Sequence, residues 1–180
     1  TTVRMKGHKV AGVDYRIVPL ADYEPDILYQ KQVEAYYADP GLNKPVGRFG
    51  NAADKWGLAN WMAAAVADEA DADVGFYHIG GVRLDSIPAG GVSAAKVYGL
   101  EPFGTLVARM EMTPAQMRRM IVSKYNDPVN AKEAHRIDLI STTPYVIVTD
   151  AADNALDVQF PKLREGRKYK VAVSDYIYRN

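Results

Sequence analysis

The sequence has 180 residues, enough for one compact domain with a sizeable hydrophobic core. Its 22 Lys and Arg residues balance its 22 Asp and Glu residues, so any anion-binding site must be local, because no overall field attracts nucleic acid or an anionic membrane. The longest apolar run, residues 61–67, is far too short to span a membrane, and the lack of cysteine excludes disulfides, thiolate nucleophiles and cysteine-based metal sites.

The predicted elements begin with strands and continue as a mixture of helices and strands. Residues 3–20 alternate apolar and polar side chains around Gly7 and Gly12, which predicts a strand pair. Helical spacing and capping residues predict helices within residues 22–38, 52–70, 93–98 and 113–125. Buried or alternating apolar runs predict strands at residues 74–79, 105–112, 137–140, 145–149, 156–160 and 168–173.

The clearest local signal is the stretch Thr113-Pro114-Ala115-Gln116. It supplies an N-cap residue, a proline at the first helical position and a glutamine that can complete a capping box. Helices and strands do not alternate strictly along the chain, so the predicted class is α+β rather than a doubly wound fold. We assign residues 1–21 to boundary strands or a linker edge and residues 22–180 to the folded domain.

Signals for catalysis by this chain are missing. The three histidines, His8, His78 and His135, do not have the close spacing of a metal-ligand pair. The serines lack the G-x-S-x-G context of an activated nucleophile. The sequence therefore predicts no catalytic residue and no metal ligand of its own.

Two short motifs suggest binding. Gly80-Gly81-Val82-Arg83 follows a predicted buried strand, so its guanidinium and open backbone could hold a phosphate or carboxylate. The alternative is a glycine-rich connector with a solvated arginine. Pro102-Phe103-Gly104 presents an aromatic ring in a non-helical turn, which serves either as a stacking face for a planar base or as a core side chain.

Other apolar residues fit core packing. Tyr36 and Tyr37 lie on the first predicted helix at helical spacing, which favours burial. The same interpretation applies to a group of methionines around the Thr113 cap: Met110, Met112, Met117 and Met120.

The order of motifs along the chain is more specific than any one of them. That order is Gly80-Gly81-Val82-Arg83, Ile87-Pro88-Ala89-Gly90, Val97-Tyr98 and Pro102-Phe103-Gly104. Over about residues 51 to 176 the sequence resembles the C-terminal domain of the 5'-nucleotidase family. The resemblance implies an α/β/β/α sandwich that binds the nucleotide, while a separate N-terminal metallophosphoesterase domain carries two divalent metal ions and activates the attacking water.

The resemblance also implies roles for individual residues. Arg83 would contact the phosphate or ribose, beside the backbone of Gly80 and Gly81, and Phe103 and Tyr176 would be the walls of an aromatic clamp on the base. Arg48 would be the upstream phosphate-binding arginine of the family. His78 stands where family members often have Asn, which alters a ligand contact.

The sequence departs from the family in two further ways. The Gly-Gly-Asp that holds the ribose hydroxyls in the family does not follow Tyr176. The metal-binding Asp-x-His and Gly-Asp motifs are absent, and too few residues precede Asp22 to hold the metal-bearing domain. We therefore expect this chain alone to be inactive and to need a metallophosphoesterase domain, in the same protein or in a separate chain.

The predicted function is recognition of a nucleotide or another phosphate ester within a 5'-nucleotidase-like hydrolase. Two alternatives stay open: a non-catalytic module that binds nucleotides or phosphoesters, and a structural domain that has lost the pocket. The resemblance implies a periplasmic or extracellular location. We expect neither a nucleic-acid partner nor a membrane span.

Overall fold

The computed structural model describes residues 1–38, 40–128 and 138–180, and it divides into two compact units, Thr1–Pro40 and Gly41–Asn180. Residues 22–40, which the sequence analysis assigns to the main domain, cluster with the first unit. His135 lies outside the described residues. Within the described ranges, no helix is both long and apolar enough to cross a bilayer.

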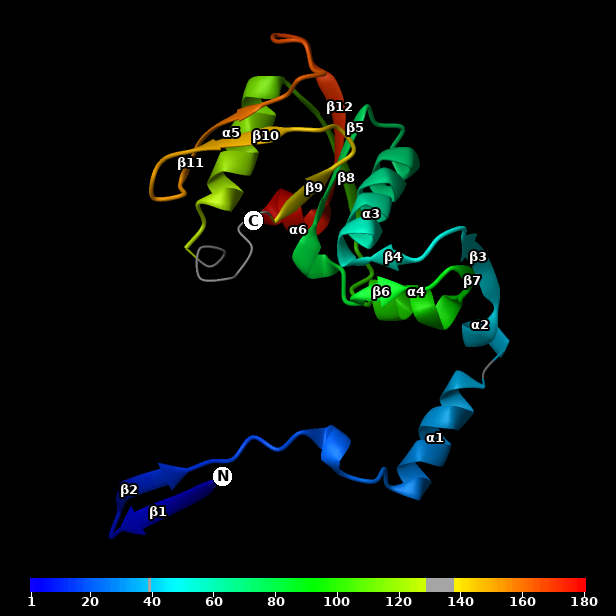
Figure 1. The fold of residues 1–180 in the computed structure, drawn as a ribbon, viewed down its shortest axis with the longest axis vertical. Helices are drawn as coiled ribbons and strands as arrows, with labels where there is room; N and C mark the ends of the chain where they lie inside the picture. Colours follow the sequence, from blue (N-terminus) through cyan, green and yellow to red (C-terminus); the bar gives the residue numbers. More distant parts are fainter. Residues whose placement is uncertain (39, 129–137) are drawn as a thin grey trace. The chain divides into compact units, whose positions relative to one another are not determined.

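The first unit consists of a hairpin followed by helices (Figure 1). Strands β1 (Thr2–Lys6) and β2 (Lys9–Asp14) pair antiparallel, as the sequence predicts. A short helix, η1 (Leu20–Asp22), and the longer α1 (Ile27–Tyr37) follow. The Asp26 side chain caps α1 by accepting hydrogen bonds from the first-turn amides.

Helix α1 buries none of its residues. Tyr36 and Tyr37 are 76% and 58% exposed, so the prediction that they pack in the core is wrong. Their helical spacing gives the helix apolar positions, but spacing alone does not supply a core to cover them.

A four-stranded mixed sheet forms the centre of the second unit. Its strand order is β8 (Val107–Met112), β12 (Tyr169–Ser174), β5 (Val74–His78) and β9 (Leu139–Ser141). Strands β12 and β5 are parallel, whereas β8 and β9 run antiparallel to their neighbours. This arrangement brings the ends of β5 and β12 and the starts of β8 and β9 to one edge of the sheet.

Smaller elements complete the part of this unit before β8. They are α2 (Pro40–Asn43), β3 (Pro45–Phe49), β4 (Ala53–Asp54), η2 (Ile79–Gly81), β6 (Ser86–Ile87), β7 (Gly90–Ser93) and α4 (Ala94–Leu100). Strand β3 pairs with β7, and β4 pairs with β6. Ser93 caps α4, as the sequence predicts.

Helix α3 (Lys55–Glu69) covers one face of the sheet (Figure 1). It begins where the Asp54 carboxylate accepts a hydrogen bond from the Gly57 amide at 2.8 Å. A Cβ atom added to Gly75 of β5 would lie 2.1 Å from the carbonyl oxygen of Ala63 in α3. The helix backbone therefore packs directly onto the strand at this point.

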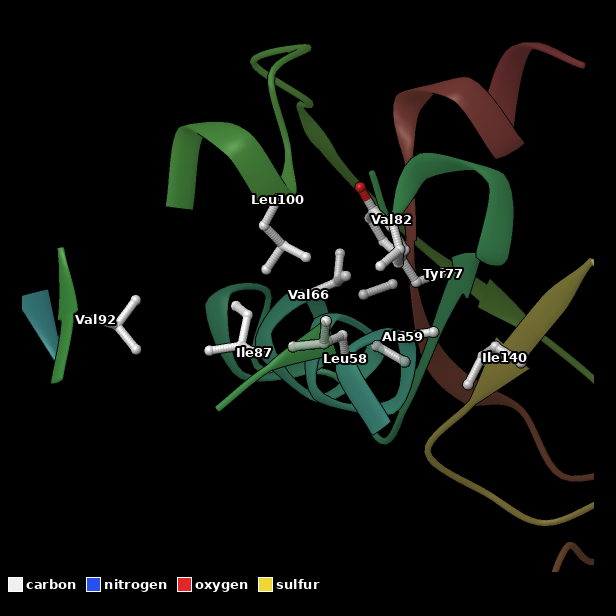
Figure 2. Close-up of a cluster of buried hydrophobic side chains, with 11 residues drawn as sticks. Leu58, Ala59, Val66, Tyr77, Val82, Ile87, Val92, Leu100 and Ile140 are labelled. Atoms are coloured by element: carbon white, nitrogen blue, oxygen red, sulfur yellow. The ribbon is translucent and has the colours of Figure 1, made fainter. Parts of the chain in front are cut away.

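Larger side chains surround this close contact. Figure 2 shows those gathered around α3, among them Leu58, Val66, Tyr77, Val82, Ile87, Leu100 and Ile140. Together they form the first of two hydrophobic clusters in the unit.

Helix α5 (Pro114–Tyr125) and the hairpin of β10 (Val146–Thr149) and β11 (Ala155–Gln159) cover the opposite face. The buried side chains on this side are large, and include Val74, Phe76, Met117, Ile121, Val158, Phe160, Val171 and Val173. Met117 is fully buried, and three other methionines pack partly buried around it: Met110, Met112 and Met120. Their predicted core packing is confirmed.

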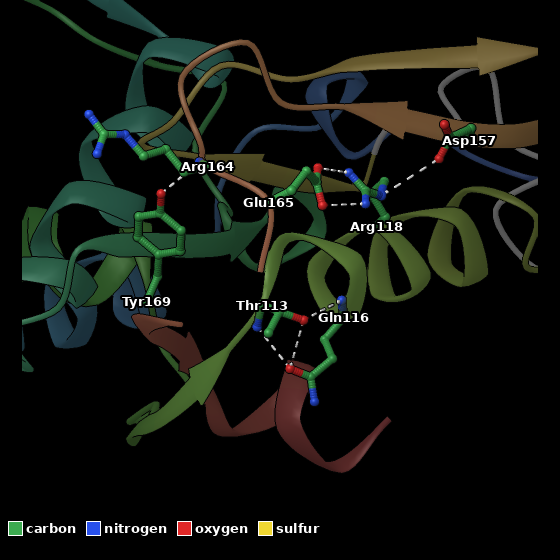
Figure 3. A network of polar contacts seen from close by, with 7 residues as sticks. All are labelled: Thr113, Gln116, Arg118, Asp157, Arg164, Glu165 and Tyr169. Carbon is green, nitrogen blue, oxygen red and sulfur yellow. Dashed lines mark hydrogen bonds and ion pairs between the residues drawn. The ribbon is translucent and has the colours of Figure 1, made fainter. Parts of the chain in front are cut away.

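Polar contacts fix both the start and the side of α5 (Figure 3). The Thr113 hydroxyl accepts from the Gln116 amide, and the Gln116 side chain accepts from the Thr113 amide at 2.8 Å, so the predicted capping box is confirmed. Arg118 donates to both carboxylate oxygens of Glu165, at 2.5 and 2.8 Å, and lies 3.8 Å from Asp157. These contacts join α5 to β11 and to the turn before β12.

The last element, α6 (Asp175–Arg179), follows β12 without a break and is capped by Ser174. No pattern in the sequence predicts this short helix. With helices on both faces of a mixed sheet, the structure confirms the predicted α+β class and its sandwich of sheets covered by helices.

Candidate functional site

A pocket of about 550 Å³ opens at one edge of the central sheet. The topology explains its position. Because β5 and β12 are parallel, His78, the last residue of β5, and Tyr176, just after β12, come to the same edge. Because β8 and β9 are antiparallel to those strands, the residues just before them, Phe103 and Asp138, come to that edge as well.

Four of the predicted site residues line this pocket: His78, Gly80, Phe103 and Tyr176. Both proposed clamp walls thus face one cavity, although they lie far apart in the sequence. Phe103 is 60% exposed and Tyr176 is 49% exposed, as expected of rings that have a free surface.

The other predicted residues lie elsewhere. Arg83 is outside the lining, but its guanidinium carbon lies 5.9 Å from the centre of the Phe103 ring. Gly81 is buried and does not line the pocket. Arg48 lies on β3 and lines a different pocket of about 380 Å³, together with Trp61. The structure therefore does not bring Arg48 to the pocket that holds Phe103 and Tyr176.

His78 forms the middle of a stack of aromatic rings. Its ring lies 4.4 Å from that of Tyr176 and 5.2 Å from that of Tyr77, centre to centre. A Cβ atom on Gly81 would lie 2.6 Å from Cε1 of His78, so the glycine provides the space that the imidazole occupies. His78 thus packs against the Tyr176 ring at the pocket.

Burial determines the protonation states of His78 and Tyr77 in this stack. Desolvation lowers the pKa of His78, with Lys124 acting in the same direction and the carboxylates of Asp138 and Glu101 opposing it. Nδ1 of His78 is buried without a hydrogen-bond partner among the described residues. Burial, aided by the negative charge of Glu101, raises the pKa of Tyr77 to about 12. The supporting rings are therefore neutral near pH 7.

Glu101 organises the loop that carries Phe103. Its Oε1 accepts hydrogen bonds from the Phe103 amide at 3.3 Å and from the Thr105 hydroxyl at 2.7 Å, and its Oε2 accepts from the Thr105 amide at 3.4 Å. Gly104 has φ +62°, a left-handed conformation that glycine adopts without strain. One carboxylate and one glycine thus determine the turn that presents the Phe103 ring.

The two walls are also joined to each other. The Asp175 amide donates to the carbonyl oxygen of Leu106 at 2.8 Å, and the Leu106 amide donates to Oδ1 of Asp175 at 3.2 Å. Arg179 lies 3.5 Å from the other carboxylate oxygen of Asp175. The loop with Phe103 and the helix with Tyr176 are therefore fastened together.

Local sequence patterns do not predict Glu101, which holds the Phe103 loop, or three residues that line the pocket, Thr105, Asp138 and Asp175. The proximity of Thr105 to the Phe103 motif was the available signal for the first two. Asp138 and Asp175 reach the site only through strand pairing, which no local pattern reveals.

The described residues do not fit a metal centre. Over residues 1–38, 40–128 and 138–180, no three His, Asp or Glu side chains lie close enough together to hold a metal ion. The pocket offers aromatic faces, hydroxyl and carboxylate acceptors and a nearby guanidinium, which are the components of a binding site for a planar, polar ligand.

Comparisons with known proteins agree on the family. Residues 42–180 match the family described as 5'-nucleotidase, C-terminal domain. No curated protein sequence matches the chain.

Solved structures resemble the fold at low sequence identity. The 5'-nucleotidase precursor from Thermus thermophilus aligns with a TM-score of 0.60 and 18% identity, over 85% of this chain and 34% of that one. NAD nucleotidase from Haemophilus influenzae gives 0.59 and 17%, over 84% and 32%. A putative 5'-nucleotidase from Staphylococcus aureus, in complex with alpha-ketoglutarate, gives 0.57 and 16%, over 86% and 35%.

This chain therefore spans about a third of the length of these structures. Because the family match covers most of the sequence, the chain belongs to the 5'-nucleotidase C-terminal domain family.

Proposed function

We propose that this chain is the substrate-recognition domain of a 5'-nucleotidase-like phosphoester hydrolase and that its substrate is a nucleotide. The observation that carries the proposal is the pocket at the sheet edge, which Phe103 and Tyr176 both line with exposed rings. A nucleobase stacked on such a ring gains about 1–3 kcal/mol. The open pocket also supports binding over a purely structural role.

Arg83 supplies the charge in this proposal. Its guanidinium lies beside the Phe103 ring, so a base stacked on Phe103 would place its sugar and phosphate within reach of a bidentate donor. His78 and Gly81 act indirectly, because they hold the Tyr176 wall in place.

Hydrolysis requires a second domain in this proposal. The metallophosphoesterase domain, in the same protein or in another chain, would supply two divalent metal ions that activate water. This chain would hold the phosphate ester in position, and positioning is itself a large part of catalysis. We also propose a periplasmic or extracellular location for the protein.

Calorimetric titration of the purified chain tests the binding role. AMP, adenosine and inorganic phosphate are titrated into the wild type, Phe103→Ala and Arg83→Ala. We expect AMP to bind, and each variant to weaken AMP about tenfold, since each removes about 1.5 kcal/mol of stacking or charged contact. Phe103→Ala should weaken adenosine as well, whereas Arg83→Ala should weaken AMP more than adenosine.

Matched controls come from residues outside the pocket. Tyr98→Ala removes an exposed aromatic ring of α4, and Arg119→Ala removes an exposed cation of α5. Both variants should bind AMP as the wild type does. The proposal fails if the wild type does not bind AMP, or if the purified chain with added divalent metal hydrolyses AMP in a reaction that Arg83→Ala abolishes.

A further inference from the structure

The hydroxyl of Thr105 has only one proton, and the structure shows where it goes. Oγ1 of Thr105 lies 2.7 Å from Oε1 of Glu101, the shortest of the contacts that Glu101 makes in this loop. A carboxylate only accepts hydrogen bonds, so the hydroxyl must be the donor. The direction of this hydrogen bond therefore follows from the chemistry of the two groups.

This direction determines what Thr105 offers to a ligand. Thr105 lines the pocket beside Phe103, and a hydroxyl oxygen that donates its proton elsewhere retains acceptor lone pairs. A ligand that meets Thr105 in the pocket must therefore donate a hydrogen bond. A ligand carbonyl at the same place would face the oxygen lone pairs and lose its hydrogen bond with water.

The pocket lining contains further acceptors as well as donors. Asp138 and Asp175 contribute carboxylate oxygens, which are acceptors. Arg179 lies against Asp175, and the Asn180 amide donates to the backbone oxygen of Tyr176 at 2.9 Å. Each of these two donor groups thus makes one contact with a protein acceptor. The Thr105 oxygen, whose hydroxyl also interacts with the buried Tyr77 hydroxyl, retains one lone pair for a ligand.

We propose that Glu101 is a specificity-determining residue: by taking the Thr105 proton, it makes the pocket select nucleobases that carry an exocyclic amino group. Adenine and cytosine have such a group, whereas hypoxanthine and uracil have a carbonyl in its place. This inference rests on the proposed function, because it assumes that the pocket between Phe103 and Tyr176 holds the base.

Paired nucleotides test the selection. AMP and IMP share their sugar and phosphate and differ at position 6 of the base, and CMP and UMP differ in the same way at position 4. Calorimetry on the purified wild-type chain should show AMP binding about tenfold tighter than IMP, and CMP tighter than UMP, since one hydrogen bond is gained in one case and lost in the other.

Three variants test whether Glu101 and Thr105 cause the preference for AMP over IMP. Glu101→Gln places an amide that can donate to Thr105, so the AMP-to-IMP ratio should fall to near one. Thr105→Val removes the hydroxyl at almost constant shape and should have the same effect. Thr105→Ser keeps the hydroxyl and should keep the ratio. Glu111→Gln, a control on β8 that removes an exposed carboxylate 3.2 Å from Lys168, should change nothing.

The outcomes separate the inference from the proposed function. A merely structural Glu101 would weaken AMP and IMP equally on substitution and leave their ratio unchanged, which would overturn the inference. Equal affinity of the wild type for AMP and IMP would also overturn it and leave nucleotide binding intact. Failure of the wild type to bind any of the four nucleotides would overturn both. Thermal unfolding of each variant identifies any that does not fold, and Thr105→Val then replaces Glu101→Gln as the deciding variant.

Discussion

The two faces of the central sheet are packed in opposite ways. On the α3 face, Ala63 and Gly75 bring the helix backbone against the strand, so small residues set the distance. On the α5 face, Phe76 and Met117 fill the space with large side chains, and both are fully buried. The same strand, β5, supplies one residue of each kind in adjacent positions.

Because of this difference, substitutions on the two faces should affect stability in different ways. Where backbones touch, there is no room for an added atom, so enlargement is costly. Where large side chains fill the space, truncation leaves a cavity, so loss of atoms is costly. Substitutions at the adjacent residues Phe76 and Gly75 test this contrast directly.

The largest effect is expected from Phe76→Ala on the α5 face. Removing a fully buried phenyl ring should lower the free energy of unfolding by about 4 kcal/mol, through lost burial and a residual cavity. Denaturant unfolding measures this loss. Met117→Leu on the same face nearly conserves volume and should cost less than about 1.5 kcal/mol. Equal costs for the two variants would contradict the account of this face.

Gly75→Ala on the α3 face should come next. The added methyl group would lie 2.1 Å from the Ala63 oxygen and 2.9 Å from Cβ of Ala67, so the helix must move away from the strand. We expect a loss of about 3 kcal/mol, measured in the same way. Gly91→Ala is the matched control, because a Cβ atom there has nothing within 4 Å. If Gly75→Ala and Gly91→Ala lower the free energy of unfolding equally, contact with the α3 backbone does not limit the size of the residue at position 75.

The smallest effect concerns the end of β5, where His78 follows Phe76 on the same side of the strand. Its pKa is lowered in the folded state, so the unfolded chain takes up a proton more readily as the pH falls below about 6.5. Stability should therefore decrease from about pH 7.5 to pH 5, and it should decrease less in His78→Asn. Denaturant unfolding at both pH values measures the difference.

Two carboxylates define the lower limit of that pH range. Hydrogen bonds from Lys170 and Arg118 lower the pKa values of Asp71 and Glu165, so these groups lose their stabilising effect in more acidic solution. Keeping the measurement at or above about pH 5 reduces their contribution. An unchanged pH dependence in His78→Asn would show that the imidazole is not desolvated in the folded state.

Local signals predicted much of the fold. The Thr113 capping box and the Ser93 cap lie within a few residues of the groups they bind, so the sequence alone shows them. The five-residue helix α6 is too short for a periodic pattern and was missed. Tyr36 and Tyr37 had the right spacing for a core, but whether another surface covers them depends on tertiary structure.

The candidate site was predictable only in part. Phe103 and Gly80 belong to recognisable motifs, and the family resemblance pointed to Tyr176. Asp175 contacts Leu106 across 69 positions of sequence, and Asp138 reaches the pocket through the pairing of β9 with β5. Such contacts depend on strand order, which the sequence pattern does not specify.

The reciprocal hydrogen bonds between Leu106 and Asp175 have a further consequence for the pocket. They join the two backbone segments that carry Phe103 and Tyr176, so the spacing of these segments is fixed without a ligand. A ligand can enter a pocket between segments held in this way with little loss of conformational entropy in the protein. We therefore expect ligand binding to leave the hydrogen bonds of Leu106 and Asp175, and the backbone around them, unchanged.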